Sequence, residues 1–394
     1  MRAYLDYNAT TPVAPAVLEA MLPFLADEFG NAGSVHTPGQ RARAAVDAAR
    51  ESVAALIGAQ PSEIVFTSGG TEADNLALFG SIAAATKRRK HVIATAIEHH
   101  AILHACDELA REGIDVTIVP LRRSGDSDGV VDPEEIQRAL RPETVLISVM
   151  HANNELGVIQ PVEEIARVAS KAGVRFHSDA VQSAGKVSLD VDRLGVDLLS
   201  ISAHKFYGPK GVGALYVRTG TPLAPRFFGG HAERDRRPGT ENVPGIVGIG
   251  KAADLARNLL AEDAGRIGAL RDRLERGLLE SVPLARVNGD RSHRVPNTIS
   301  MSFPGAGGEA LLISLDLQGI ACSTGAACSS GSTEPSHVLL ALGLAREEAR
   351  STLRFSLGRP TTAEEIDHAM SVIPAVVERI RALSPREPQV AAAR

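Results

Sequence analysis

Cysteine is scarce in this 394-residue chain, and a membrane-spanning run, a signal-peptide segment and a basic net charge are all missing. The three cysteines, Cys106, Cys322 and Cys328, are too few and too unevenly spaced for a disulfide framework, which is typical of a reducing compartment. No apolar run reaches the roughly 18 to 20 residues of a spanning helix, and the first residues hold no apolar segment like that of a signal peptide. The formal net charge of −5 gives no basic surface for nucleic acid or for an anionic membrane. We therefore expect a cytoplasmic protein whose partners are small molecules and proteins, with no nucleic acid and no membrane among them.

Lysine is also rare, with seven lysines among the 42 lysine and arginine residues. One of them, Lys205, stands in "SISAHKFYGPKG", directly after the apolar run "VDLLSIS" and before a Gly-Pro turn. A lysine can lose its proton and act as a nucleophile, whereas an arginine in practice cannot. Taken alone, Lys205 is better interpreted as an ordinary loop cation. Whether it is a reactive amine depends on the residues in the rest of the chain.

Most of the chain alternates short β-rich runs with helical segments. Helical periodicity appears at residues 14–29 and 39–58, and further helices are expected from Thr71, His100, Pro133 and Pro161. The β-rich runs lie at residues 63–68, 91–96, 114–120, 144–150, 174–179, 196–202 and 213–218. Strands that are apolar on both faces and alternate with helices are typical of a mostly parallel sheet covered by helices. The pattern predicts an α/β fold.

A second pattern follows residue 218. Two long helices are expected at about 243–260 and 262–281, followed by strands at 297–303 and 351–357 and by helices at 308–316 and from Thr362. This pattern predicts a smaller α+β domain beside the large α/β domain. We expect the large domain at residues 14–260, the small domain at residues 1–13 plus 261–384, and a disordered tail at 385–394.

Polar residues follow the predicted strands. Since ligands of open α/β sheets bind beyond the carboxyl ends of the strands, these residues are considered together. The turn Gly69-Gly70 before Thr71 suits a phosphate at the start of a helix. A capping box from Thr71 to Asp74 would explain the same residue types without a ligand. The others are His99 and His100, Asn153 and Asn154, Asp179 and Gln182, and His204 and Lys205.

One cofactor needs this set of groups. Pyridoxal phosphate requires a lysine for its Schiff base, a carboxylate on its ring nitrogen and a cradle for its phosphate. Asp179 can supply the carboxylate, because an opposite charge at contact distance favours the protonated ring. A planar group such as His99 can stack on the ring, and amides such as Asn154 and Gln182 can bond its phenolic oxygen. Lys205 is then the amine that carries the cofactor.

Long stretches of the chain resemble one known family, the cysteine desulfurases of the class-V, fold-type I pyridoxal-phosphate enzymes, and in particular their group I branch. The resemblance runs from Tyr4 to about Met370 and rests on "YLDYNATTP", "FGNAGSVH", "FTSGGTEADN", "MHANNELG", "HSDAVQSAGK", "SAHKFYGPKG", "RRPGTENV", "ACSSGSTEPSHVLLALG" and "LRFSLGRPTT". It implies a fold-type I architecture, with a mostly parallel sheet of the seven-stranded type between helices and a smaller α+β domain. Two motifs depart from the family pattern: His231 and Ala232 replace Gly and Gln, and "YLDYNATTP" replaces "YLDNAATTP".

Carried over residue by residue, the resemblance implies a role for each member of the site. Lys205 is implied as the Schiff-base lysine and Asp179 as the partner of the ring nitrogen. The resemblance implies that Thr240 reaches the phosphate of a neighbouring subunit, which makes the protein a homodimer, and that Arg354 binds the substrate carboxylate. The remaining roles are His99 stacked on the ring and moving protons, Asn154 and Gln182 at the ring oxygen, Asn154 also at the substrate, and Gly70, Thr71, Ser202 and His204 at the phosphate.

Two cysteines share one loop rich in glycine, serine and alanine, "ACSTGAACSSGS". Small residues let such a loop carry a thiol from the cofactor to an acceptor. The family motif selects Cys328 as the nucleophile, and the alternatives are a zinc pair or a buried thiol. Zinc needs further ligands, and no second cysteine pair has suitable spacing. Cys106 lies within a helical pattern and is expected in the core.

The activity that follows is conversion of L-cysteine to L-alanine, which leaves a persulfide on Cys328 for iron-sulfur cluster or other sulfur-containing cofactor synthesis. The partners expected are L-cysteine, a second copy of the chain and a sulfur-acceptor protein such as an iron-sulfur scaffold. The alternatives are a selenocysteine lyase or another class-V pyridoxal-phosphate enzyme, or a non-catalytic sulfur-relay scaffold. The sequence does not identify the acceptor, and it assigns no role to Cys322.

Overall fold

A seven-stranded sheet forms the centre of the computed structural model, which describes residues 1–122, 129–324 and 334–383. Six of its strands are parallel, and β8 runs antiparallel to both of its neighbours. This confirms the mostly parallel sheet that the sequence predicts. The order across the sheet is β2 (Ile64–Thr67), β8 (Gly213–Val217), β7 (Leu198–Ser202), β6 (Arg175–Asp179), β5 (Thr144–Ser148), β3 (His91–Thr95) and β4 (Asp115–Val119).

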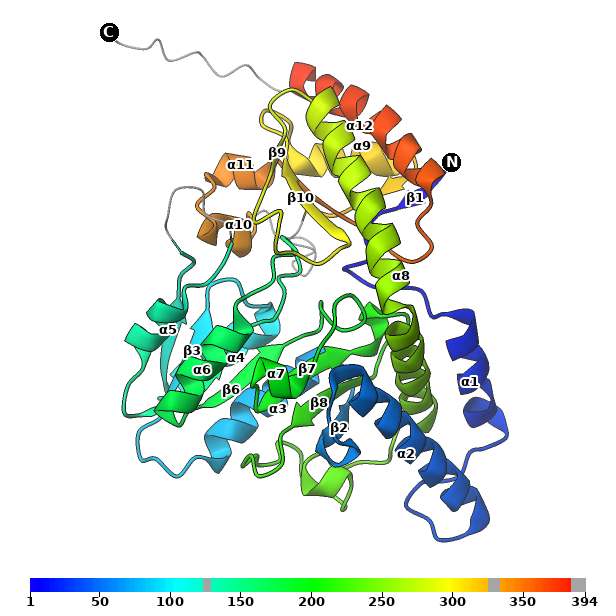
Figure 1. Cartoon of the computed structure of the whole chain (residues 1–394), viewed down its shortest axis with the longest axis vertical. Helices are drawn as coiled ribbons and strands as arrows, with labels where there is room; N and C mark the ends of the chain where they lie inside the picture. The colour runs from blue at the N-terminus through cyan, green and yellow to red at the C-terminus, as the bar shows by residue number, and fades with distance from the viewer. Residues whose placement is uncertain (123–128, 325–333, 384–394) are drawn as a thin grey trace.

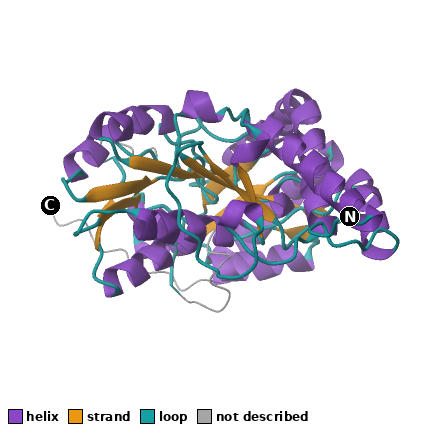
Figure 2. Cartoon of the chain, turned by 90° about the horizontal axis from the view of Figure 1, so that it is seen from below, coloured by secondary structure: helices purple, strands orange, loops and turns teal. Residues whose placement is uncertain are grey.

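Helices cover both faces of this sheet (Figure 2). Successive strand residues point to opposite faces, so Val92 packs with one hydrophobic cluster and Ile93 with another. The first face is covered by α3 (Gly70–Ala84) and α4 (His100–Arg111). The second face is covered by α2 (Thr37–Ile57), α5 (Pro133–Ala139), α6 (Val162–Ala172) and α7 (Val191–Leu194).

A smaller core lies beyond one end of the sheet (Figure 1). It is built around the antiparallel sheet β9 (Arg286–Val287), β10 (Thr298–Ser302) and β12 (Thr352–Ser356), and around the short parallel pair β1 (Ala3–Tyr4) and β11 (Ile320–Ala321). Its helices are α9 (Gly308–Leu317) and α12 (Ala363–Leu383), with α10 (His337–Ala341) and α11 (Arg346–Arg350) nearby. Because β1 and β11 pair, the start of the chain becomes part of this core.

One helix connects the two parts. α8 (Val243–Ser281) is continuous over 39 residues, so the prediction of two helices, at 243–260 and 262–281, is wrong. The residues at the expected break, Ala261 and Glu262, are good helix formers, and no proline or glycine interrupts them. The domain boundary expected after residue 260 falls inside this helix, and the expected tail, 385–394, lies outside the described residues.

In the part of the chain that the structure describes, the remaining helices are α1 (Pro15–Ala26), which packs on α8, and three short 3₁₀ turns at Pro61–Glu63, Ala203–Lys205 and Glu233–Asp235. None of the helices in the described ranges is long and apolar enough to cross a bilayer. The parallel strands all end at the same edge of the sheet, which faces the smaller core. The residues that follow them therefore meet between the two parts of the molecule.

Candidate active site

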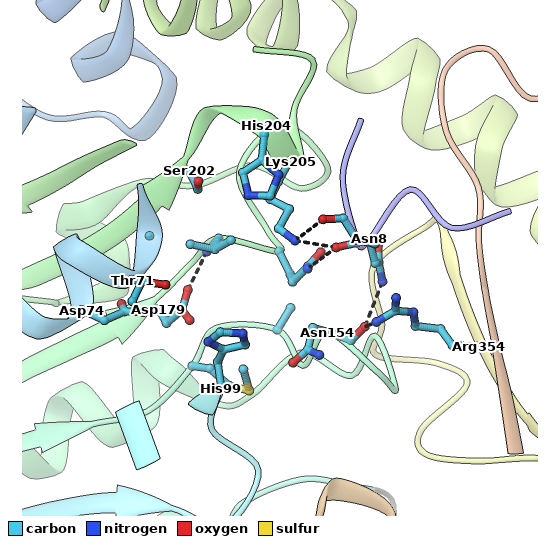
Figure 3. A pocket seen from close by; sticks show the side chains of 16 residues that line it. Asn8, Thr71, Asp74, His99, Asn154, Asp179, Ser202, His204, Lys205 and Arg354 are labelled. Atoms are coloured by element: carbon cyan, nitrogen blue, oxygen red, sulfur yellow. Dashed lines mark hydrogen bonds between the residues drawn. The ribbon is translucent and has the colours of Figure 1, made fainter. Parts of the chain in front are cut away.

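A cavity of about 310 Å³ lies at this edge of the sheet (Figure 3). Its volume is at the lower end of the range of about 300–1,000 Å³ for small-molecule sites. The cavity brings together most of the residues that the sequence singled out: Gly70, Thr71, His99, Asn154, Asp179, Gln182, Ser202, His204, Lys205 and Arg354. Its lining also contains Asn8, Ala9 and Asp74, none of which the sequence assigned to the site.

Three of the singled-out residues, His100, Asn153 and Thr240, do not line the described cavity. Thr240 is exposed on the loop before α8 and does not line the cavity of its own chain. Cys328 falls in the segment 325–333, outside the described residues. The unusual His231 is exposed and lies 2.6 Å from Asp235 through its Nδ1, and neither it nor Ala232 lines the cavity.

Lys205 ends the short 3₁₀ turn that follows β7, so its side chain enters the cavity from the sheet edge. Its Nζ donates hydrogen bonds to the backbone carbonyls of Asn8 at 2.7 Å and Ala9 at 2.8 Å. These acceptors come from a segment almost two hundred residues earlier in the chain. The N-terminal segment therefore holds the amine in the cavity.

Asp179 is the last residue of β6 and only 5% exposed. Its Oδ1 accepts a hydrogen bond from the backbone N–H of Val181 at 2.9 Å. Burial raises the pKa of Asp179 to about 6, although this hydrogen bond and the charge of Lys205 act in the opposite direction. A buried carboxyl of this kind is stabilised as an anion by a cationic partner. A protonated ring nitrogen is such a partner.

Asp74 lies on α3 close to Asp179 and is almost fully buried. Its Oδ1 has no hydrogen-bond partner among the described residues and lies 3.6 Å from Nε2 of His177. Burial and the neighbouring charge of Asp179 raise the pKa of Asp74 well above its usual range. A second buried carboxyl next to Asp179 makes this part of the cavity favourable for a cationic group of a ligand.

The alternative interpretation of Asp74, a capping box with Thr71, is wrong. α3 begins at Gly70, one residue earlier than expected, and its N-cap is Gly69. Thr71 therefore already belongs to the first turn, and no side chain caps this helix. Asp74 belongs to the motif "TSGGTEADN", which the sequence already singled out. Its carboxyl faces the cavity instead of capping the helix.

His99 is the N-cap of α4, and its Nδ1 accepts a hydrogen bond from the backbone N–H of Ala101 at 3.1 Å. Burial, then the charges of Lys205 and His100, lower the pKa of His99 to about 4. The ring is thus neutral at pH 7 and carries its proton on Nε2, because Nδ1 is the acceptor. Figure 3 shows His99 across the cavity from Lys205, where a flat neutral ring can cover one face of a ligand.

The start of α3 and the end of β7 form an end of the cavity that suits an anion. Unpaired N–H groups of the first turn of α3 and its dipole favour a phosphate. A Cβ on Gly70 would lie 2.7 Å from Cγ2 of Val181, so only glycine allows this close approach. Burial, then the charges of Lys205 and Lys210, lower the pKa of His204 to about 4.

Arg354 reaches the opposite end of the cavity from β12 of the smaller core. Its guanidinium donates to the backbone carbonyl of Asn154 at 3.0 Å and to Oδ1 of Asp6 at 2.8 Å. Its Nε is buried without a hydrogen-bond partner among the described residues. An unsatisfied donor beside a cavity suits a carboxylate ligand.

The two described cysteines are poor nucleophiles. Cys322 is 8% exposed, and burial raises the pKa of its thiol far above its usual range. Cys106 packs inside α4, and burial raises the pKa of its thiol to about 12. Both thiols stay protonated at neutral pH.

Pyridoxal phosphate fits this donor set. The buried carboxyl of Asp179 matches the ring nitrogen, the neutral ring of His99 matches the aromatic face, and the start of α3 matches the phosphate. Lys205 supplies an amine at the same cavity. Asn154 and Gln182 line it as well, within reach of a ligand between the two ends.

Comparisons with known proteins agree with this site. The family model "Aminotransferase class-V" matches residues 3–369. A cysteine desulfurase IscS of Dictyoglomus turgidum is 48% identical over 382 residues, which cover 97% of this chain and 96% of the relative. A solved NifS-like protein matches with a TM-score of 0.89 and 40% identity over 96% of this chain and 100% of its own. A structure described as "SspA in complex with cysteine" matches with a TM-score of 0.80 and 37% identity over 91% of this chain and 100% of its own. Matches of this length and identity place the chain in the class-V aminotransferase family, whose cofactor is pyridoxal phosphate, and among its cysteine desulfurases.

Proposed function

We infer that this protein is a pyridoxal-phosphate-dependent cysteine desulfurase that converts L-cysteine to L-alanine and retains the sulfur as a persulfide on Cys328. The observation that carries the proposal is the cavity in which Lys205, Asp179 and Arg354 meet. The near-full-length similarity to a cysteine desulfurase, and to a protein solved with cysteine, supports the same substrate.

The reaction balances without an outside oxidant or reductant. The bond between Cβ and sulfur of the substrate breaks, and a bond forms between that sulfur and the sulfur of Cys328. One L-cysteine and one thiol thus give one L-alanine and one persulfide, with Cβ reduced and the two sulfurs oxidised. When bound, pyridoxal phosphate supplies an electron sink for the carbanion at Cα.

The chain's own residues bind the substrate and move its protons. Arg354 binds the substrate carboxylate and so orients Cα toward Lys205, which takes the proton from Cα and returns a proton during formation of alanine. The neutral ring of His99 would cover one face of the cofactor, and it can accept a proton and return it during turnover. Asp179 stays ionised next to the cationic ring nitrogen.

Cys328 is proposed as the nucleophile because the other two cysteines are poor candidates. A nucleophilic thiol needs an accessible thiolate, and burial keeps the thiols of Cys322 and Cys106 protonated. The family motif selects the remaining cysteine, Cys328. Its structure lies outside the described residues, so this assignment is made from the sequence and from the chemistry of the other two.

The wider setting is part of the same proposal. We expect a cytoplasmic homodimer in which Thr240 reaches the phosphate site of the neighbouring subunit. The persulfide would pass to an acceptor protein, such as an iron-sulfur scaffold. We also propose that the large domain, 14–260, holds the cofactor and that the small domain, 1–13 plus 261–384, carries the loop of Cys328.

The test is alanine formation from L-cysteine by the purified protein, compared with Cys328→Ser and Cys322→Ser. We expect Cys328→Ser to bind pyridoxal phosphate normally but to form no alanine, because a hydroxyl cannot accept sulfur. Cys322→Ser should keep most of the activity. Reversed behaviour would assign the nucleophile to Cys322, and full activity in both variants would exclude the persulfide route. Amino transfer that depends on a keto acid, or turnover of selenocysteine alone, would support the other class-V activities.

A further inference from the structure

One buried amine has no part in the reaction described above. Lys186 lies four residues after Gln182, in the turn that follows β6. Gly185 has a φ of +73°, and a Cβ there would lie 2.8 Å from Cβ of Phe206, so only glycine fits this sharp turn. The turn brings Lys186 back to Gln182 and toward the cavity.

Within residues 1–122, 129–324 and 334–383, Lys186 has no acidic partner to explain its position. Burial, then the charges of Lys205 and Arg354, hold its pKa well below its usual range, and no carboxylate of the described chain offsets these effects. Burying an amine without an acidic partner costs free energy, which its hydrogen bonds only partly offset. Its Nζ donates to Oε1 of Gln182 at 2.7 Å and to Oδ1 of Asn8 at 3.0 Å.

These two bonds fix how two amides face the cavity. At its other end, Gln182 donates from Nε2 to the backbone carbonyl of Asn8 at 3.0 Å. Asn8 likewise donates from Nδ2 to the backbone carbonyl of Asn154 at 3.1 Å. Because a backbone carbonyl only accepts, each amide has a single orientation, with its oxygen on Lys186. The second hydrogen on Nε2 of Gln182 is then left for a ligand in the cavity.

Asn8 links this arrangement to Lys205, the amine that would carry the cofactor. Its backbone carbonyl accepts from both Nε2 of Gln182 and Nζ of Lys205. The carbonyl belongs to a residue that is 1% exposed, and its side-chain oxygen is held by Lys186 and by Nδ2 of Asn297. A change at Lys186 therefore reaches two groups that line the cofactor cavity.

We propose that Lys186 is a positioning residue that fixes the amide of Gln182, and through Asn8 the acceptor of Lys205, so that an N–H of Gln182 faces the bound cofactor. The proposal rests on the pyridoxal-phosphate function. It assigns to Lys186 no contact with the cofactor or substrate. The effect of Lys186 on cofactor binding should therefore depend on the side chain at position 182.

The experiment measures the dissociation constant of pyridoxal phosphate for cofactor-stripped full-length protein by equilibrium dialysis. Lys186→Met keeps most of the stem but removes the donors, and we expect about tenfold weaker binding from the loss of one buried hydrogen bond. Lys186→Arg keeps the donors and should restore most of the affinity, since Lys186 borders an open groove. Lys171→Met, at an exposed position of α6, is the matched control and should bind as the wild type does.

The second arm tests whether Lys186 acts through Gln182. In a Gln182→Leu background, Lys186→Met should cause a clearly smaller loss of affinity than in the wild type, because only the route through Asn8 remains. Losses that multiply in the double variant, or unchanged affinity in Lys186→Met, would overturn the proposal and leave Lys186 a structural residue. Should Lys186→Met not fold, Lys186→Gln is compared in the same two backgrounds. Failure of the function itself would differ, because the wild type and Lys171→Met would then not bind pyridoxal phosphate.

Discussion

Asp179 opposes folding of the cofactor-free protein at neutral pH, because its carboxyl must ionise in a buried position. Its pKa of about 6 in the folded chain exceeds the ordinary value of 3.8. Between these two values the folded chain holds a proton that the unfolded chain has lost, so the free energy of unfolding falls as the pH rises. The difference of about two pKa units corresponds to about 3 kcal/mol of lost stability above pH 6.

Asp179→Asn removes this penalty while keeping the shape of the side chain. In the cofactor-free protein, its advantage in unfolding free energy over the wild type should grow by about 2 kcal/mol from pH 4 to pH 7. With cofactor the effect reverses, because the ring nitrogen loses its anionic partner. Loss of one partner of a buried ion pair costs about 3–5 kcal/mol, which makes cofactor binding at least about a hundredfold weaker.

The assay is urea unfolding of both cofactor-free proteins at several pH values, together with dialysis against pyridoxal phosphate. Asp107→Asn is the control, because it makes the same change at an exposed position of α4. A variant with no growing advantage toward pH 7 would show that burial does not control the pKa of Asp179. Unchanged cofactor affinity would remove Asp179 from the cofactor site.

Three further outcomes are expected. Lys205→Ala should abolish turnover and the borohydride-dependent labelling of the protein by pyridoxal phosphate, and peptide mapping that finds another labelled lysine would contradict the assignment. Arg354→Lys should raise KM for L-cysteine about ten- to a hundredfold in steady-state kinetics, because an ammonium cannot form the paired bonds of a guanidinium, and an unchanged KM would place the carboxylate elsewhere. The native protein should sediment as a homodimer, and Thr240→Val should weaken cofactor binding; a fully active monomer would refute the role of Thr240.

Much of the fold and the site could be predicted from local patterns. Strands buried on both faces and separated by helices predicted the central sheet, and the polar residues after these strands predicted that Asp179 and Lys205 would lie at one edge. The division of α8 was wrong, since nothing between residues 260 and 262 stops a helix. The two-residue strands β1, β9 and β11 were not predicted, because such short pairings have no periodicity of their own.

The sequence by itself determined the chemistry, in that its motifs contained the lysine, the carboxylate, the histidine and the cysteine that a desulfurase needs. Only the tertiary structure decided how these groups are held. Asn8 meets Lys205, Arg354 meets Asp6, and Lys186 joins Asn8 to Gln182, across separations of 197, 348 and 178 residues. Local periodicity contains no information on such distant pairs, because they form only when β1 and β12 assemble the smaller core against the edge of the large sheet. The pKa values of Asp179 and His99 depend on the tertiary structure too, since burial in the folded chain is the main cause of both shifts.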